Sequence, residues 1–253
     1  MEHQPELDWG MRFAVLNELI RVHQCFKMSQ ETLFLAVNYV DRFLSVHVIR
    51  ASDMPLVGVV ALFIAAKMEE TLYPTPNALA RGFASQAVSA RRIVEGERVM
   101  LNRLGFELGS PGPGVYYGWA RGEGPVERTV DLLTSYFLEV TIMDEAFISC
   151  ASSYLAAAAL NLSRLISGKG DWTESLADTY GYRAAELDCP SFLIWLACRE
   201  ALARHPAVYE KYKSDTFDAI SLKVQEVVRM ETVGDRGVDT LPTKALEMRL
   251  FQP

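Results

Sequence analysis

The chain has 253 residues, half of them hydrophobic, enough for one large or two ordinary domains with sizeable cores. Its 25 basic and 32 acidic residues give a net charge of −7, which argues against a nucleic-acid binder that relies on phosphate attraction. The four cysteines are scattered without a CxxC pair, so neither a zinc site nor a disulfide framework is indicated. Residues 1–8 are polar and acidic, unlike a secretory leader, so we expect a reduced, intracellular protein.

Helical patterns follow one another through the first half of the chain. Residues 1–8 are expected to form a short, loose arm, and residues 10–26 an amphipathic helix. Ser29 suits the N-cap of a second helix, because its side chain can accept a hydrogen bond from a free N–H group of the first turn. That second helix carries apolar residues at helical spacing (Leu33, Val37, Val40 and Leu44).

The third helix, at 54–68, is apolar on nearly every side, so it must be surrounded by protein or by lipid. Its uninterrupted apolar run, 55–66, is shorter than the roughly 18 residues that a membrane span needs. We therefore predict a core helix. YPTP at 73–76 ends it, and helices around 77–83 and 89–104 complete a five-helix set.

Glycine and proline alternate in GSPGPG at 109–114, which predicts a boundary between two domains. Beyond this boundary the same plan recurs, with helices expected at 126–140, 147–162, 173–180 and 189–204. No segment alternates apolar and polar residues as a half-buried strand would.

The predicted fold is therefore all-α, with two tandem five-helix bundles. The first bundle is expected at 9–109 and the second at 115–228. The tail at 229–253 mixes glycine, proline and charged residues, and the sequence leaves its structure open.

No catalytic motif is visible: the chain has no phosphate-binding glycine loop, no HExxH and no GxSxG. The segment 196–200 matches LxCxE, the motif that binds the retinoblastoma pocket, but it lies in an apolar-periodic helix and is interpreted as core. By pattern alone, Lys67 is a capping residue at a helix C-terminus and Glu97 belongs to a solvated face.

Several segments resemble a cyclin box of the A/B type. In the first half these are Met11-Arg12, ETLFLAVNYVDRFLS at 31–45, LVGVVALFIAAKMEE at 56–70 and ERVMLNRLGFEL at 97–108. In the second half, DWTESLADTYGY at 171–182 and EKYKSDTFDAISL at 210–222 resemble A-type segments. The chain is almost the cyclin core alone, and in this it is similar to the cyclins encoded by gammaherpesviruses, the murine one in particular.

The resemblance implies a non-catalytic protein, without a cofactor, that binds and activates a cyclin-dependent kinase by repositioning its αC helix and activation loop. Lys67 and Glu97 match the family's central contact with the kinase. The surrounding interface positions are matched by a further set (Ile64, Met68, Glu70, Leu101, Phe106 and Leu108). Arg12 and Asp41 match a structural pair that ties the first two helices together.

The resemblance fails at the groove that binds RxL motifs of substrates and inhibitors. Cellular A-type cyclins form it with MRAILxxW on the first helix and a glutamine on the third. Here Met11 is kept, but Ala14 replaces the isoleucine, Val15 the leucine, Glu18 the tryptophan and Pro55 the glutamine. Loss of an aromatic anchor typically costs ~2 kcal/mol or more, so we expect weak RxL docking.

The resemblance further implies a heterodimer with the kinase shared by A- and E-type cyclins, which deregulates the cell cycle in the nucleus and cytoplasm of a host cell. It implies no membrane, metal or nucleic-acid partner. The alternative is a cyclin-fold transcription factor, similar to general transcription factor B, that binds DNA. The net charge and the missing CxxC motifs oppose it. A helical enzyme has no candidate nucleophile, base or metal cluster.

Overall fold

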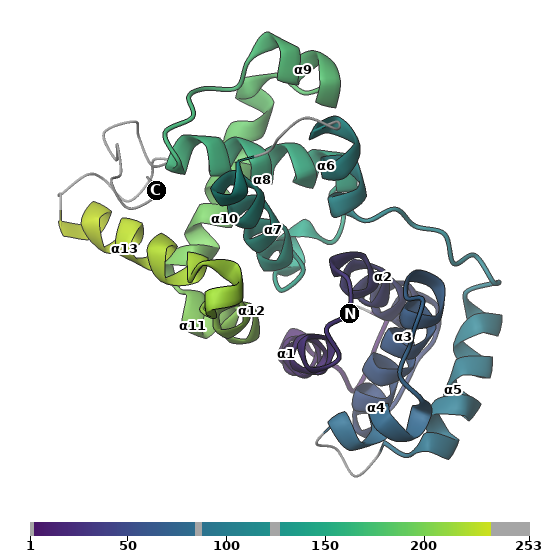
Figure 1. The fold of residues 1–253 in the computed structure, drawn as a ribbon. Helices are drawn as coiled ribbons and strands as arrows, with labels where there is room; N and C mark the ends of the chain where they lie inside the picture. Colours follow the sequence, from purple (N-terminus) through teal and green to yellow (C-terminus); the bar gives the residue numbers. More distant parts are fainter. Residues whose placement is uncertain (1–2, 84–87, 122–126, 234–253) are drawn as a thin grey trace. The chain divides into compact units, whose positions relative to one another are not determined.

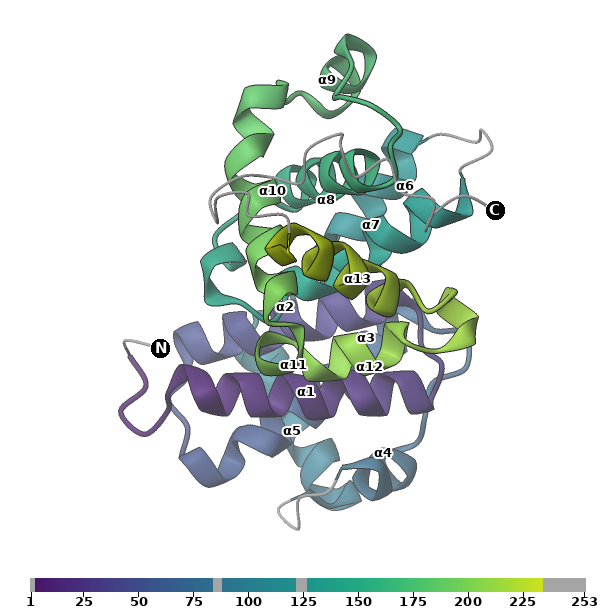
Figure 2. The ribbon, with the colours of Figure 1, turned by 90° about the vertical axis from the view of Figure 1, so that its left-hand side faces the viewer.

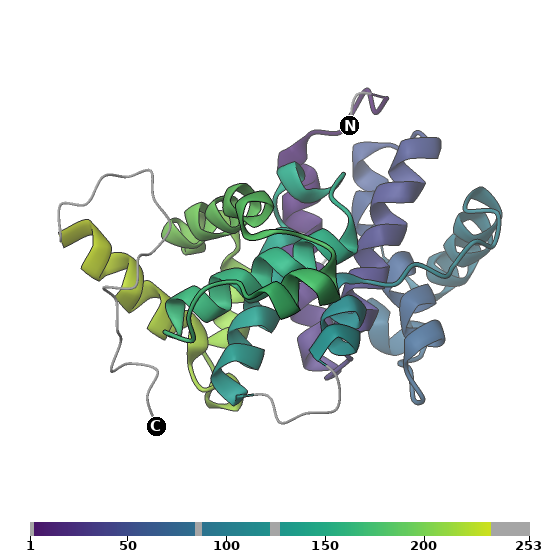
Figure 3. The ribbon, with the colours of Figure 1, turned by 90° about the horizontal axis from the view of Figure 1, so that it is seen from above.

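The computed structural model describes residues 3–83, 88–121 and 127–233, and all regular structure in these residues is helical. The chain divides into two compact units, residues 1–112 and 113–253 (Figure 1). The division falls within the predicted GSPGPG boundary. Figure 3 shows the same units from above, the first in purple to blue and the second in teal to yellow. The all-α prediction is confirmed.

In its described residues, the first unit has the five α-helices that the sequence predicts, with a short 3-10 helix (η1, Ala51–Asp53) before the third. Figure 2 shows the first of these helices in purple. Their bounds are α1 (Trp9–Cys25), α2 (Gln30–Val46), α3 (Met54–Glu69), α4 (Pro76–Gly82) and α5 (Ala90–Arg103).

Helix α3 is the core of this unit, because α1, α2, α4 and α5 all contact it. The segment Ala51–Glu69 is long and apolar enough to cross a membrane on length and composition alone, but most of it is buried inside the unit. Lys67, Met68 and Glu69, at its C-terminal end, are exposed. The core helix is therefore as predicted, with an exposed end.

The N-terminal arm, where it is described, is held in place, and the prediction of a loose arm is wrong. The side chain of Gln4 is buried and donates to the carbonyls of Leu44 and His47, each at 2.7 Å. Its oxygen accepts from the Ile49 amide at 3.1 Å. The last carbonyls of a helix have no partner within the helix, and Gln4 supplies one at the end of α2.

Arg12 and Asp41 tie α1 to α2, as the resemblance implies. The buried Arg12 guanidinium donates from Nε and Nη2 to the two carboxylate oxygens of Asp41, at 2.7 Å each. Two parallel bonds fix the relative orientation of both side chains, which a single charge contact would not do.

The second unit is built around α8, which contacts α6, α7 and α10 (Figure 1). Its helices are α6 (Pro113–Arg121), α7 (Arg128–Thr141), α8 (Ser152–Ile166), α9 (Glu174–Tyr180), α10 (Ala184–Arg199), α11 (Ala201–Arg204), α12 (Pro206–Tyr212) and α13 (Ile220–Val233), with 3-10 turns η2 (Glu145–Phe147) and η3 (Asp215–Phe217).

This unit has more helices than the predicted bundle. Helix α6 begins inside GSPGPG, because proline is well suited to the first position of a helix. Helix α13 continues into the predicted tail as far as Val233, and the rest of the tail, 234–253, lies outside the described residues. The interpretation of LxCxE as core is confirmed, since Cys198 is fully buried in α10.

His205 is fully buried, and its Nε2 shares a hydrogen bond with the Tyr136 hydroxyl at 2.8 Å. Burial, with a smaller effect of Arg204, lowers the pKa of His205 to about 3. In the unfolded chain a histidine titrates near pH ~6.5, so below that pH protons favour the unfolded state.

We therefore expect His205 to make stability fall with acidification between pH ~6.5 and ~3, by up to about 1.4 kcal/mol per pH unit, with no effect above this window. Urea unfolding at pH 7 and pH 5 measures this, and a His205→Gln variant should lose less stability between the two. Equal losses in both proteins would contradict the assignment.

Candidate functional site

The predicted central pair is brought together by α3 and α5. Lys67 lies in the last turn of α3, where a cation is favoured by the helix dipole. Its Nζ donates to Oε1 of Glu97 on α5 at 2.6 Å and lies 5.2 Å from the centre of the Phe63 ring. The side chains remain 38% and 15% exposed, so the pair adds little to the stability of the fold. Its position on the surface leaves it open to a partner.

Exposed apolar side chains lie in the last turn of α3 and just beyond its end. Met68 is half-exposed, Leu72 is 92% exposed, and Tyr73 is half-exposed with its ring edge against Phe63. Large apolar groups gathered at a surface indicate an interaction site. The sequence prediction missed Leu72 and Tyr73, although apolar residues directly after a helix end, in TLYPTP, were a usable signal.

The remaining predicted interface residues differ in what the structure lets them do. Ile64 is buried in α3, so its side chain serves the core of the unit and the prediction of a partner contact is not supported by its position. Leu101, one turn beyond Glu97 on α5, and Leu108 are half-buried and can still reach a partner.

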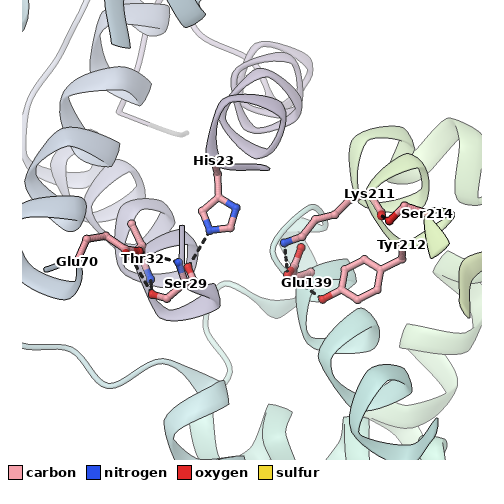
Figure 4. Close-up of polar contacts among 8 residues, drawn as sticks. All are labelled: His23, Ser29, Thr32, Glu70, Glu139, Lys211, Tyr212 and Ser214. Atoms are coloured by element: carbon pink, nitrogen blue, oxygen red, sulfur yellow. Dashed lines mark hydrogen bonds and ion pairs between the residues drawn. The ribbon is translucent and has the colours of Figure 1, made fainter. Parts of the chain in front are cut away.

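Glu70 is held within the unit. The Ser29 amide and the Thr32 hydroxyl both donate to its Oε1, at 2.6 and 2.5 Å, and His23 Nε2 donates to the Ser29 carbonyl at 2.7 Å (Figure 4). Burial alone would raise the pKa of Glu70, but the bonds from Thr32 and Ser29 and the nearby His23 lower it overall. Glu70 therefore ties the C-terminal end of α3 to the start of α2, and so positions Lys67.

The acidic groups around this end of α3 repel one another. Glu31, in the first turn of α2, is partly buried and lies near Glu69. Burial first, and the charge of Glu69 second, raise the pKa of Glu31 to about 7. A positively charged group of a partner placed here would favour the ionised form.

Phe106 lies in a strained turn that leaves its side chain exposed. Helix α5 ends in a Schellman motif, with the Phe106 amide bonded to the Leu101 carbonyl at 3.0 Å and Gly105 at φ 63°. Phe106 itself has φ 58°, which costs a non-glycine residue roughly 1–2 kcal/mol, and its ring is 64% exposed. The turn persists because Tyr39 bonds the Leu108 carbonyl and Arg42 bonds the Glu107 carbonyl, each at 2.8 Å.

Backbone strain that displays an exposed aromatic ring is typical of a binding site. We expect Phe106→Gly to raise the free energy of unfolding by about 1 kcal/mol while it weakens partner binding. Phe106→Ala should weaken binding equally without the gain in stability, since alanine keeps the strain. Urea unfolding and calorimetric titration measure the two effects, and a loss of stability in the glycine variant would contradict the prediction.

The predicted docking positions lie along α1 and the start of α3. Val15 is buried so tightly against Gly58 that a Cβ on Gly58 would lie 2.5 Å from a Val15 methyl group. Ala14 is exposed, Glu18 pairs with Arg21 at 3.5 Å, and Met11 and Pro55 are half-buried. The side chains that could form a docking groove here are thus small, charged or turned into the core.

Within the described ranges, no three His, Cys, Asp or Glu side chains come together as a metal site would require. The Lys67–Glu97 pair and the exposed Met68, Leu72 and Tyr73 make the candidate site a surface of charged and apolar side chains.

Known proteins resemble this chain along most of its length. A cyclin N-terminal domain matches residues 1–109 and a cyclin C-terminal domain matches residues 123–226. The G2/mitotic-specific cyclin-4 of Candida albicans is 40% identical over 229 residues, 90% of this chain and 47% of that protein. The G2/mitotic-specific cyclin-3 of Saccharomyces cerevisiae is 37% identical over 216 residues, 85% of this chain and 50% of that protein. The chain thus spans about half the length of these curated relatives.

Two solved structures share the fold. A viral cyclin from herpesvirus saimiri superposes with a TM-score of 0.65 at 14% identity, over 87% of this chain and 90% of that one. A chain of the CAK complex from Chaetomium thermophilum superposes with a TM-score of 0.56 at 18% identity, over 94% and 83% of the two chains. With both cyclin domains matched in order, the chain belongs to the cyclin family.

Proposed function

We propose that this chain is the regulatory subunit of a cyclin-dependent protein kinase, which it binds and activates as a heterodimer. Cyclins are non-catalytic regulatory subunits of such kinases, and the fungal relatives are named as mitotic cyclins. The observation that carries the proposal is the surface ion pair of Lys67 and Glu97, with exposed apolar side chains beside it.

The mechanism is a population shift. A free kinase holds the glutamate of its αC helix away from the strand lysine that binds the phosphates of ATP. A cyclin that binds only the inward position of αC stabilises that position by the difference in its affinity for the two states. Met68, Leu101 and Phe106 supply apolar area, and Lys67 caps backbone carbonyls of the kinase while Glu97 holds its ammonium group in place.

Two observations bear on which kinase this chain binds, and they favour different kinases. The A-type segments favour the kinase shared by A- and E-type cyclins, whereas the names of the fungal relatives favour a kinase that acts in G2 or mitosis. Co-purification of the tagged chain with a panel of cyclin-dependent kinases tests both. Stable capture of one kinase is expected, and capture of none would contradict the proposal.

A weak docking groove is part of the proposal, because Ala14, Glu18 and Pro55 replace the residues that anchor RxL motifs in A-type cyclins. We expect an RxL peptide to bind at least about thirtyfold more weakly than it binds a cellular A-type cyclin, the equivalent of ~2 kcal/mol. Fluorescence titration of one labelled peptide against both proteins measures this. Equal affinities would show that the groove is intact.

A gammaherpesvirus origin, with deregulation of a host cell cycle, stays a prediction. The relatives named above are fungal, and the viral structure at 14% identity supports the fold alone. Nothing among these relatives supports a murine viral source. We also propose a location in the nucleus and cytoplasm, which imaging of the tagged chain would test.

A further inference from the structure

The first unit contains a pocket of about 290 Å³ between the end of α2, the start of α3 and the middle of α5. Its walls are mainly apolar (Phe43, Leu56, Val57, Val60, Val99 and Met100). This volume lies close to the lower end of the range for small-ligand sites and suits one aromatic or large aliphatic group. The pocket can therefore take a single apolar anchor.

The pocket and the Lys67–Glu97 pair lie on opposite flanks of α5. At about 100° per residue, Arg92, Gly96 and Val99 face one flank, and Glu97 and Leu101 face the other. Gly96 lies so close to α3 that a Cβ there would be 2.8 Å from a Val60 methyl group. A partner in the pocket would thus leave the Lys67 side of α5 free.

The wall of the pocket formed by the α2–α3 connection is fixed in place. His47 and Ile49 line it. The Gln4 side chain donates to the His47 carbonyl at 2.7 Å and accepts from the Ile49 amide at 3.1 Å. Because the buried Gln4 also bonds Leu44, this wall is preformed, which lowers the cost of ordering on binding.

The charges at the rim leave a positive balance. Asp53 is neutralised by Arg92 at 2.6 Å, and Glu95 by Arg91 at 2.8 Å. Arg103, one turn beyond Val99 on the same flank of α5, has no side-chain partner among the described residues and adds a further positive charge. The charge of Arg50 is offset by Glu6, whose Oε2 accepts from the adjacent Ala51 amide at 3.1 Å. This rim is basic on a chain whose net charge is −7, so it favours an acidic partner over a second copy of the chain.

We infer that this pocket is a second docking site, which binds an acidic peptide segment through one apolar side chain. The anchor fills the space beside Val60 and Val99, and the flanking carboxylates of the peptide lie near Arg103. The site is independent of the proposed kinase contact, and its test needs no kinase.

The probe is a short fluorescein-labelled peptide in which one phenylalanine is flanked by aspartates, titrated with the full chain by anisotropy. Replacing the phenylalanine by alanine should weaken binding at least about tenfold, because burial of the ring is lost. Replacing the aspartates by lysines should abolish binding. Arg103→Ala should weaken binding and reduce its dependence on salt, whereas Arg81→Ala on α4 should do neither.

Val99→Asp and Val94→Asp form the matched pair. Both valines lie on α5, they are 46% and 52% exposed, and each substitution adds one negative charge. Val99→Asp should weaken binding at least about tenfold and Val94→Asp should not. Equal losses, or equal binding of the phenylalanine and alanine peptides, would overturn the inference. So would a dimer in analytical ultracentrifugation that Val99→Asp abolishes, because a second copy would then be the occupant.

Discussion

Replacing Lys67 by alanine is expected to weaken kinase binding at least about thirtyfold, the equivalent of ~2 kcal/mol. The reason is that a kinase seated on this surface desolvates Glu97, whose one ion-pair partner among the described residues is the Lys67 ammonium group at 2.6 Å. Without it, a carboxylate and the kinase carbonyls would be buried unpaired. Glu97→Ala should have a similar effect, since the Lys67 ammonium would lose its anchor. Calorimetry with the co-purified kinase measures both.

The control is the neighbouring ion pair of Arg91 and Glu95, which lies on the same helix at 2.8 Å. Arg91→Ala should leave the affinity within about twofold of the wild type, because exposed pairs contribute little. All three variants should unfold at nearly the wild-type urea concentration. Undiminished binding by both Lys67→Ala and Glu97→Ala would refute the assignment of this site.

The second large effect is expected in the second unit, where Lys211→Met should lower the free energy of unfolding by about 3–5 kcal/mol. Lys211 Nζ donates to Glu139 Oε1 at 2.6 Å, and the Tyr212 hydroxyl donates to the same oxygen at 2.9 Å (Figure 4). The two charged side chains are only 6% and 1% exposed. Removing the cation takes this counter-charge away from a buried carboxylate.

Lys213→Met is the matched control, since Lys213 makes an exposed pair with Glu210 at 3.4 Å. It should change stability by less than about 1 kcal/mol. The double variant Lys211→Met with Glu139→Leu should recover much of the loss, because no buried charge remains. Equal effects of the two lysine variants in urea unfolding would show that the buried pair does not stabilise the unit.

The helices of the first unit could be predicted because each depends on local signals. Helix α3 follows from an unbroken apolar run, and α2 from the N-cap Ser29, whose side chain accepts a bond from the Thr32 amide. The structure shows that α5 is capped in the same way, since the Ser89 side chain accepts from the Arg92 amide. The second unit was harder, because α6 begins at a proline inside a segment that was interpreted as a linker.

The contacts between distant segments could not be predicted from periodicity. Gln4 was assigned to a loose arm because its partners, at Leu44 to Ile49, follow some forty residues later. Glu70 was assigned to the partner surface, and only the structure shows it bonded to Ser29 and Thr32. The strain at Phe106 is a property of the backbone, which no residue type reveals.

The residues of the site itself came from the resemblance. By physics alone Lys67 and Glu97 are ordinary surface residues, and no pattern in the sequence pairs them across α3 and α5. Their contact at 2.6 Å is what the structure adds. The same comparison of motifs placed Ile64 at the interface, where burial in α3 now argues against it.

The most direct measurement titrates a purified, inactive cyclin-dependent kinase with this chain and follows phosphorylation of histone by ATP. Phosphorylation should rise with the concentration of the wild-type chain and reach a plateau, while Lys67→Ala should need at least about thirtyfold more protein to reach the same rate. If no kinase of the panel responds to the wild-type chain, or if Lys67→Ala activates at the wild-type concentration, activation through this surface is contradicted.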